Sequence, residues 1–389
     1  MSKGISPLVA YVLTVFISIA GIVVVITIGL PAVQRAKESG TFNEALHNLQ
    51  IIDNAIREVA SEGIDSQRTV QLGVTGGEYR VNNDTGTLTF SFVSSSGLMP
   101  YGSYAKQGNI RIFGGGFNGL VAYWNFDESS GSTADDSSGQ RNDGTLYDFN
   151  TTNTDGNTPP QWVDGKFDKA LSFDGVDDYV LVKDSDSLDI TDEITIEAWV
   201  YWKGGSGWRS IISKPDANTQ WSEHYILTLE NGNYLNFITT NSTGENRLKY
   251  FVAFPQNTWT YVVGIFNGTN KFIYINGDKV AQNSWGGPLT TSDSYLLIGA
   301  DRNWQESEDI TQFFNGTIDE VRIYSRALSE QEIKNMYEGS KSTVNITMLL
   351  TYPKIKITGN TRIGTGNYKL CIKKTGYSYG KAVVSVNVC

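Results

Sequence analysis

The sequence predicts an α+β protein with a long hydrophobic N-terminal α-helix, a β-sandwich headpiece, and a further antiparallel β unit inserted into that headpiece. No charged residue occurs from Ile5 to Gln34. Beyond the helix, short runs of alternating apolar and polar residues are separated by turn residues, consistent with 40 glycines in 389 residues. Gly- and Ser-rich joints bracket a central unit, and a linear order of three domains is the alternative. The predicted boundaries are 5–63 for the helix, 64–116 plus 342–389 for the headpiece, and 117–341 for the inserted unit.

The N-terminal helix is predicted in two parts. As a helix, the uncharged stretch is roughly 45 Å long, against about 30 Å for the hydrocarbon core of a bilayer. Pro31 is expected to kink or end the apolar part. An apolar stripe at helical spacing then continues to about Gly63. Its members are Phe42, Leu46, Leu49, Ile52, Ile56 and Val59.

Within the central unit, two local signals predict particular elements. The run Lys271 to Val280 holds Asn276-Gly277 between two apolar strands, which is a strong hairpin signal. Ser329 and Glu332 form a capping box and predict a short helix at about 330–338.

Charge and metal-ligating residues exclude several functions. The formal net charge is −10 and there is no basic run, which argues against nucleic-acid binding. Two His and two Cys leave no set for a zinc or Cys–His site. Cys371 and Cys389 are expected to form a disulfide if the headpiece is extracellular.

The first residues carry a family resemblance. The run Lys3-Gly4-Ile5-Ser6-Pro7-Leu8-Val9-Ala10 with the apolar stretch after it resembles the N-terminus of archaeal type IV pilin-like proteins. The resemblance implies a leader peptide at 1–4 and cleavage by prepilin peptidase between Gly4 and Ile5. Val9 stands where bacterial pilins carry a glutamate. A plain uncleaved membrane anchor is the alternative.

This resemblance also implies a location and partners. The protein would lie in the cytoplasmic membrane before assembly and afterwards in an extracellular filament on the cell surface. Its partners would be copies of itself in a helical filament, prepilin peptidase and the pilus assembly machinery. The regions 64–116 and 342–389 would form a pilin-type β headpiece.

The central unit carries a second resemblance, through five motifs. They resemble the laminin-G-like jelly-roll domain of the concanavalin A-like superfamily. The motifs are Gly119–Glu128, Asp136–Leu146, Ala170–Val180, Ile194–Val200 and Gly316–Tyr324 with Arg326–Ser329.

Jelly rolls of this family often hold a structural calcium ion. The resemblance implies that Asp136, Asn142 and Asp143 lie in one loop and that Asp319 reaches them if the first and last strands pair. Asx turns are the alternative explanation for the loop residues. A second acidic group, Asp174, Asp177 and Asp178, is interpreted as a turn with solvated charges.

Loop aromatics predict a glycan or cell-surface ligand for the jelly roll. Tryptophans in Gly-, Ser- and Asn-rich segments can stack on sugars, although they can equally cover a core edge. The candidate ligand-binding residues are Trp208, Trp221, His224, Arg302 and Trp304.

No catalytic residues are predicted, and the chain is expected not to be an enzyme. A glycosidase would need two suitably spaced carboxylates. The nearest candidate, Glu197, lies in a strand among apolar neighbours.

Sequons predict N-glycosylation in an extracellular protein. They lie at Asn83, Asn150, Asn241, Asn267, Asn315 and Asn345.

Together these features predict a structural subunit of a type IV pilus-like filament that displays a jelly roll for adhesion. A monomeric membrane-anchored carbohydrate-binding protein is the alternative, followed by an anchored glycosidase.

Overall fold

The computed structural model describes residues 30–148, 158–215, 223–302, 310–339 and 344–389. The chain divides into two compact units. The first unit runs to Gly115 and resumes at Lys341, and the second spans Gly116–Ser340. The predicted leader, its cleavage point at Gly4 and Ile5, and residues 5–29 lie outside the described residues.

The predicted α+β class with a long hydrophobic N-terminal helix is wrong. The described chain is mostly β-strand, with two α-helices, α2 (Leu30–Ser61) and α3 (Glu330–Glu338), and one 3-10 turn, η2 (Asp186–Leu188). No described helix combines the length and the apolar character needed to cross a membrane. The reason is that α2 carries charged side chains from Arg35 onward.

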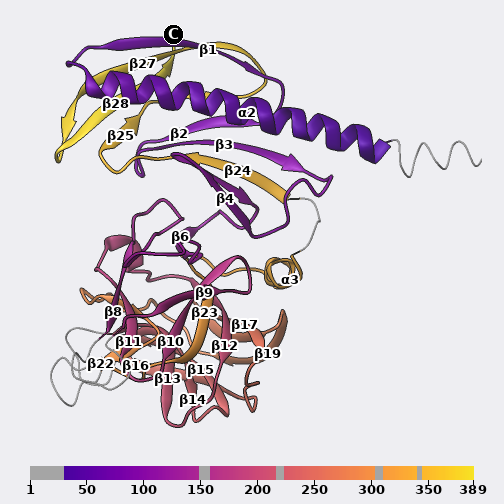
Figure 1. Cartoon of the computed structure of the whole chain (residues 1–389), viewed down its shortest axis with the longest axis vertical. Coiled ribbons are helices and arrows are strands. Elements are labelled where there is room, and N and C mark those ends of the chain that lie inside the picture. The colour runs from indigo at the N-terminus through magenta and orange to yellow at the C-terminus, as the bar shows by residue number, and fades with distance from the viewer. Residues whose placement is uncertain (1–29, 149–157, 216–222, 303–309, 340–343) are drawn as a thin grey trace, which may run out of the picture. The chain divides into compact units, whose positions relative to one another are not determined.

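The first unit contains two sheets and α2 (Figure 1). One sheet has the order β1-β27-β28-β25 and the other β26-β2-β3-β24-β5-β4. Strand β24 follows the inserted unit in the chain yet pairs with both β3 and β5, which precede it. The strands are β1 (Gln67–Val74), β2 (Glu78–Asn82), β3 (Thr87–Ser94), β4 (Ser103–Gln107), β5 (Ile110–Gly114), β24 (Val344–Leu350), β25 (Ile355–Thr358), β26 (Arg362–Ile363), β27 (Gly366–Ser378) and β28 (Lys381–Val388).

The apolar stripe of α2 forms the centre of the first core. Leu49, Ile52, Ile56 and Val59 are wholly buried against both sheets, whereas Phe42 and Leu46 are half-buried. The helical spacing that predicts this stripe therefore identifies the face that packs on the strands.

A buried carboxylate also ties α2 to the end of β3. Glu38 is 4% exposed and accepts hydrogen bonds from Ser94 Oγ at 2.6 Å and from the N–H groups of Ser95 and Ser96 at 3.1 Å. Ser95 Oγ, Ser96 Oγ and Gln34 Nε2 also donate to it. Burial by itself would raise the pKa of Glu38, but these hydrogen bonds outweigh it and lower the pKa to about 2.

The predicted disulfide is confirmed. Cys371 on β27 is bonded to Cys389 at the end of the chain, across a sequence separation of 18 residues. We expect the double variant Cys371→Ser/Cys389→Ser to lower the free energy of unfolding of the first unit by about 3 kcal/mol, because a loop of this length constrains the unfolded chain by roughly that amount. Calorimetry on the full chain measures it. If the unfolding transition of the second unit shifted by the same amount, the disulfide would not act on the first unit alone.

The second unit is a sandwich of two antiparallel sheets, each with eight strands. The first has the order β19-β18-β17-β12-β23-β10-β9, with β6 also paired to β23, and the second β16-β15-β14-β13-β20-β11-β8-β7. The strands of the first sheet are β6 (Leu120–Trp124), β9 (Gln161–Asp164), β10 (Lys169–Asp174), β12 (Ile194–Trp202), β17 (Trp259–Phe266), β18 (Asn270–Ile275), β19 (Asp278–Ser284) and β23 (Asn315–Tyr324). Those of the second are β7 (Thr133–Ala134), β8 (Gly144–Asp148), β11 (Asp178–Val182), β13 (Trp208–Pro215), β14 (Glu223–Glu230), β15 (Tyr234–Asn241), β16 (Gly244–Phe251) and β20 (Leu296–Ile298). A separate short pair is formed by β21 (Asp301–Arg302) and β22 (Ile310–Thr311).

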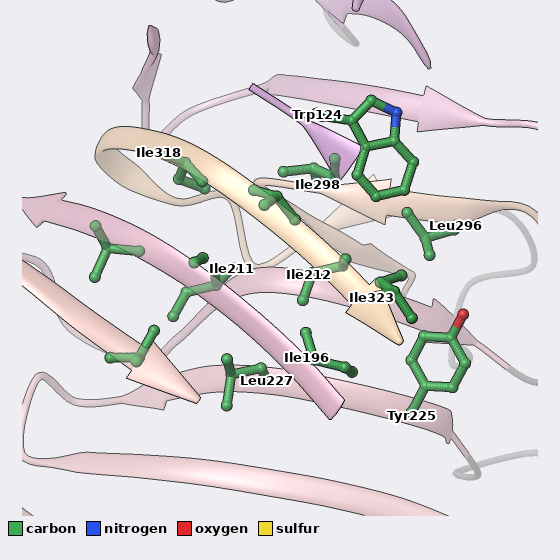
Figure 2. Packing of buried hydrophobic residues seen from close by; sticks show 14 of the residues in the cluster. Trp124, Ile196, Ile211, Ile212, Tyr225, Leu227, Leu296, Ile298, Ile318 and Ile323 are labelled. Carbon is green, nitrogen blue, oxygen red and sulfur yellow. The ribbon is translucent and has the colours of Figure 1, made fainter. Parts of the chain in front are cut away.

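The core of this unit lies between its two sheets. Alternate side chains from both sheets point toward one another in Figure 2 and are almost wholly buried. The labelled examples come from β6, β12, β13, β14, β20 and β23, and include Trp124, Ile196, Ile212, Leu227, Ile298 and Ile323.

Both local predictions in this unit are confirmed. Strands β18 and β19 pair around Asn276 and Gly277, which have φ of 52° and 86° as a type I′ turn requires. Helix α3 begins with the reciprocal capping box of Ser329 and Glu332 and ends at Gly339 in the left-handed conformation.

Candidate functional site

The outer face of the β13–β16 part of the second sheet is the strongest candidate site. Directly opposite residues in antiparallel strands share a face of the sheet. One such row crosses the four strands as Trp208, Glu230, Tyr234 and Phe251. The next row is Ser210, Thr228, Asn236 and Lys249. The intervening residues, such as Leu229 and Leu235, belong to the core, so both rows face away from it.

Cations lie over aromatic rings on this outer face. The guanidinium of Arg247 lies 4.6 Å from the centre of the Trp208 ring, and Lys249 Nζ lies 3.7 Å from that of Tyr234. Lys249 Nζ is also 2.8 Å from Glu230 Oε2. Phe251 packs edge-on against Tyr234 and is 62% exposed. The face therefore offers ring surfaces and charged groups together.

Asn236 is the most informative residue of the outer face. Its side chain is wholly buried, and neither Oδ1 nor Nδ2 has a hydrogen-bond partner in the described part of the chain. Leaving such an amide unpaired costs about 1–3 kcal/mol, so its retention calls for an explanation. The residue directly opposite is the flexible Lys249. An amide presents one acceptor and a pair of donors, which together match vicinal hydroxyl groups.

Two hydroxyl groups lie in the same row as Asn236, those of Ser210 and Thr228. Ser210 Oγ donates to Thr228 Oγ1 at 3.4 Å and to Gln312 Oε1 at 3.2 Å, while Thr228 Oγ1 donates to a backbone carbonyl. Both hydroxyl residues are wholly buried. The outer face thus combines buried polar groups in one row with aromatic rings in the next.

The structure places the predicted ligand-binding residues differently. Trp208 is half-buried and belongs to the outer face, whereas Trp221 and Trp304 lie outside the described residues. His224 is wholly buried, its ring packs 4.8 Å from that of Tyr225, and it is not one of the outer-face residues. Arg302 is half-buried, with its guanidinium 6.0 Å from the Tyr295 ring, and lies in β21 rather than in β13–β16.

Sequence reasoning missed Tyr234, Asn236, Arg247, Lys249 and Phe251. The alternation of 234–241 and 244–251 could have identified them as one face of two paired strands. It could not have shown that Asn236 is buried.

The predicted calcium ligands are not brought together as one group of converging carboxylate oxygens among the described residues. Asp136 accepts hydrogen bonds on both oxygens, from Tyr123 N at 3.0 Å and from Asn142 N at 3.0 Å among others. Asp143 Oδ1 accepts from Asp136 N at 2.8 Å, so these residues hold their own loop together. Asp319 Oδ2 accepts two N–H groups, from Lys166 and Phe167, while its Oδ1 is buried without a hydrogen-bond partner among the described residues. Among the described acidic side chains, those whose oxygens converge do not include this set.

The carboxylate considered for a glycosidase lies in a buried ion network. Glu197 is wholly buried, and its two oxygens accept from Arg322 Nη1 at 3.1 Å and from the Tyr261 hydroxyl at 2.5 Å. Burial raises the pKa of Glu197, and the guanidinium of Arg322 opposes that shift. Glu197 therefore neutralises a neighbouring cation.

The sequons differ in accessibility. Asn83 and Asn345 are exposed and Asn267 is half-buried, so all three remain candidates for N-glycosylation. Asn150 lies outside the described residues.

Two sequons have an occupied amide nitrogen, which is the atom that would carry a glycan. Asn241 is buried, and its Nδ2 donates to the carbonyl of Gly286 at 2.9 Å. Asn315 Nδ2 donates to the carbonyl of Gly204 at 2.8 Å. The folded protein does not present these amides, and we do not expect modification there.

Comparisons with known proteins concern the second unit. No curated protein matches the chain. Among solved structures, domain 4 of AbnA, a GH43 extracellular arabinanase from Geobacillus stearothermophilus in complex with arabinotriose, shares 20% identity at a TM-score of 0.42, covering 56% of this chain and 98% of that one. The binding domain of Paraclostridial Mosquitocidal Protein 1 shares 19% at 0.42, covering 57% and 52%. The ligand-binding domain of botulinum neurotoxin serotype D, in complex with N-acetylneuraminic acid, shares 16% at 0.42, covering 58% and 52%.

These similarities concern the fold alone, and the chain spans about half the length of the toxin domains. A family match is more specific, because residues 174–334 match Laminin_G_3, described as the concanavalin A-like lectin/glucanases superfamily. Residues 174–334 therefore carry the laminin-G-like, concanavalin A-like jelly-roll domain that the sequence motifs predict.

Proposed function

We propose that the second unit binds carbohydrate through its outer face, on a protein presented at the cell surface. The single observation that carries the proposal is the buried, unpaired amide of Asn236 in the row of residues next to that of Trp208 and Tyr234. A buried polar group retained without a partner is explained if a ligand supplies the partner. The extended ring surfaces of Trp208 and Tyr234 suit the apolar faces of pyranose rings.

The ligand would enter by displacing Lys249 and Arg247 from the rings that they cover. Both side chains are long and flexible, so moving them costs little compared with the burial of a sugar face. A freed Lys249 or Arg247 could then donate to hydroxyl or carboxylate groups of the ligand. This sequence of events leaves the two sheets unchanged and needs only side-chain motion.

The experiment is a glycan array followed by calorimetric titration of the best ligand into the full chain. We expect Trp208→Ala and Tyr234→Ala each to weaken binding at least tenfold, because a lost stacking contact of about 1.4 kcal/mol is a factor of ten. Tyr379→Ala is the matched control, since Tyr379 is a fully exposed aromatic of the first unit. An array without any bound glycan, or equal losses in the control, would contradict the proposal.

A second variant separates binding from folding. Asn236→Leu removes the unpaired amide at similar volume, so we expect it to abolish glycan binding while raising the free energy of unfolding by about 1 kcal/mol. A structural role for Asn236 predicts the opposite sign for stability. Binding that survives in this variant would exclude the amide from the site.

We also propose that the chain is presented as a subunit of a pilus-like filament. The support is the resemblance of Lys3–Ala10 to pilin-like N-termini, the uncharged segment before α2, and exposed Leu30 and Val33 at the described start of α2. The disulfide is consistent with an oxidising compartment. Mass spectrometry should find a mature N-terminus at Ile5, and electron microscopy should show filaments. Single molecules that keep residues 1–4 would favour a membrane-anchored binding protein.

A further inference from the structure

The turn between β10 and β11 gathers three carboxylates. One oxygen from each of Asp174, Asp177 and Asp178 lies within 4.8 Å of those of the other two. The sequence suggests solvated charges at this turn, but the structure differs. Asp177 is 1% exposed and Asp178 is 3% exposed. A buried carboxylate without compensation is costly, because it transfers a charge from water to the interior.

Asp178 in particular lacks compensation. Its Oδ2 accepts the N–H of Asp174 at 2.9 Å, but its buried Oδ1 accepts no hydrogen bond from the described residues. The residue directly opposite it on β8 is another acid, Asp148. Burial, and then the charges of Asp174, Asp177 and Asp148, raise the pKa of Asp178 to about 8, against one hydrogen bond that lowers it. The turn thus concentrates negative charge around a buried oxygen that accepts no hydrogen bond from the described residues.

Another acidic group of this unit, formed by Asp184, Asp189 and Asp293, shows how the fold neutralises such a cluster with a side chain. There, the wholly buried Lys214 places Nζ 2.6 Å from Asp184 Oδ1 and 3.5 Å from Asp189 Oδ1. Beside the 174–178 turn the cation is Arg209, and its Nη1 donates instead to the carbonyl oxygens of Gly175 and Phe313, at 2.9 and 2.8 Å. Arg209 therefore fixes the backbone of the turn without occupying the free oxygen of Asp178.

We propose that Asp174, Asp177 and Asp178 bind a calcium ion, with Asp148 on the neighbouring strand adding negative charge. Calcium takes six to eight oxygen ligands in flexible geometry, which suits carboxylates on a turn completed by water, whereas magnesium demands a near-ideal octahedron. The ion would neutralise the buried carboxylates and join the β10–β11 turn to β8. This site is separate from the outer face proposed to bind carbohydrate, and either proposal can fail without the other.

The test uses the full chain stripped of metal with a chelator and then titrated with calcium chloride alone. We expect calcium to raise the Tm of the second unit and magnesium at the same concentration to have a much smaller effect. Terbium should bind at the same place and luminesce, since Tyr147 and Tyr179 stack 5.4 Å apart next to Asp148 and Asp178, and calcium should quench this signal by competition.

Variants identify the ligands. Asp178→Asn should weaken calcium binding at least tenfold, yet leave the metal-free protein as stable as the parent or more so, because it removes a buried negative charge. Asp177→Asn is the second variant if the first fails to fold. Asp293→Asn, in the other acidic group, is the control and should bind calcium normally. The proposal is overturned by a parent chain without a calcium response, by an equal magnesium response, or by unchanged calcium affinity in both cluster variants.

Discussion

Replacing Arg322 with Leu is expected to destabilise the second unit by about 3–5 kcal/mol, the largest single effect predicted for this chain. Arg322 is 5% exposed and its guanidinium contacts two buried carboxylates, those of Glu197 and Glu320. The Tyr123 hydroxyl donates to both oxygens of Glu320 at 2.9 and 3.0 Å. Removing the only cation of this network would leave two buried negative charges facing each other.

The pH dependence of this variant has a definite sign. Burial already raises the pKa of Glu197 and of Glu320 in the parent, and Arg322 opposes that shift. Without Arg322 both pKa values rise further. A carboxyl whose pKa is raised on folding loses its stabilising contribution as the pH rises through the folded-state value. The loss of stability in Arg322→Leu should therefore be greater at pH 8 than at pH 5, as measured by denaturant unfolding.

Two further variants test whether the loss of stability in Arg322→Leu comes from the buried charges. Adding Glu197→Leu and Glu320→Leu to Arg322→Leu should restore most of the stability, because an apolar replacement of the whole network leaves no uncompensated charge. Arg57→Leu breaks an exposed ion pair with Asp53 and should cost less than about 1 kcal/mol. If Arg322→Leu lowers the free energy of unfolding by no more than Arg57→Leu does, the buried ion network does not stabilise the second unit.

Glu38→Ala is expected to destabilise the first unit by roughly 3–4 kcal/mol. The variant removes the acceptor of the buried Ser94 hydroxyl and of the N–H groups of the exposed Ser95 and half-buried Ser96, and a buried donor left without an acceptor costs about 1–3 kcal/mol. The transition of the second unit should not move. Glu58→Ala is the control, because Glu58 forms an exposed ion pair with Arg68.

Acid should remove the advantage of Glu38. Its pKa is lowered on folding to about 2, from an ordinary value of 4.5. For a carboxyl whose pKa is lowered, the stabilisation is complete above the unfolded value and is lost as the pH falls through the folded value. The parent and Glu38→Ala should therefore differ fully at pH 6 and converge between about pH 4.5 and pH 2. A difference independent of pH would indicate that packing, and not the charge, stabilises this contact.

The apolar N-terminal region shows where sequence periodicity succeeds and where it fails. The stripe from Leu49 to Val59 predicts the buried face of α2 because every third or fourth residue of a helix shares a face. The predicted α+β class is wrong because it is based on one uncharged stretch, whereas most of the described chain forms β-strands.

The candidate sites show a different limit. Glycan and calcium ligands chosen by residue type and loop context include His224 and Asp136, both of which the fold buries, and Asp136 accepts hydrogen bonds from its own loop. Asn236 and Asp178, which keep buried atoms without a hydrogen-bond partner among the described residues, are ordinary members of strand and turn patterns. Residue type is visible in a sequence, whereas an unpaired buried atom is visible only when all its neighbours are placed.

The sequence by itself determined the jelly-roll motifs, the α3 capping box, the Asn276-Gly277 hairpin and the single possible disulfide. Each of these depends on residues close in the chain or on a unique covalent pairing. Only the tertiary structure decided that β24 pairs with β3 and β5, that Glu38 is buried under three serines, and which face of β15 points outward. The physical reason is that burial and hydrogen-bond satisfaction depend on groups brought from distant parts of the chain, and local propensity carries no information about them.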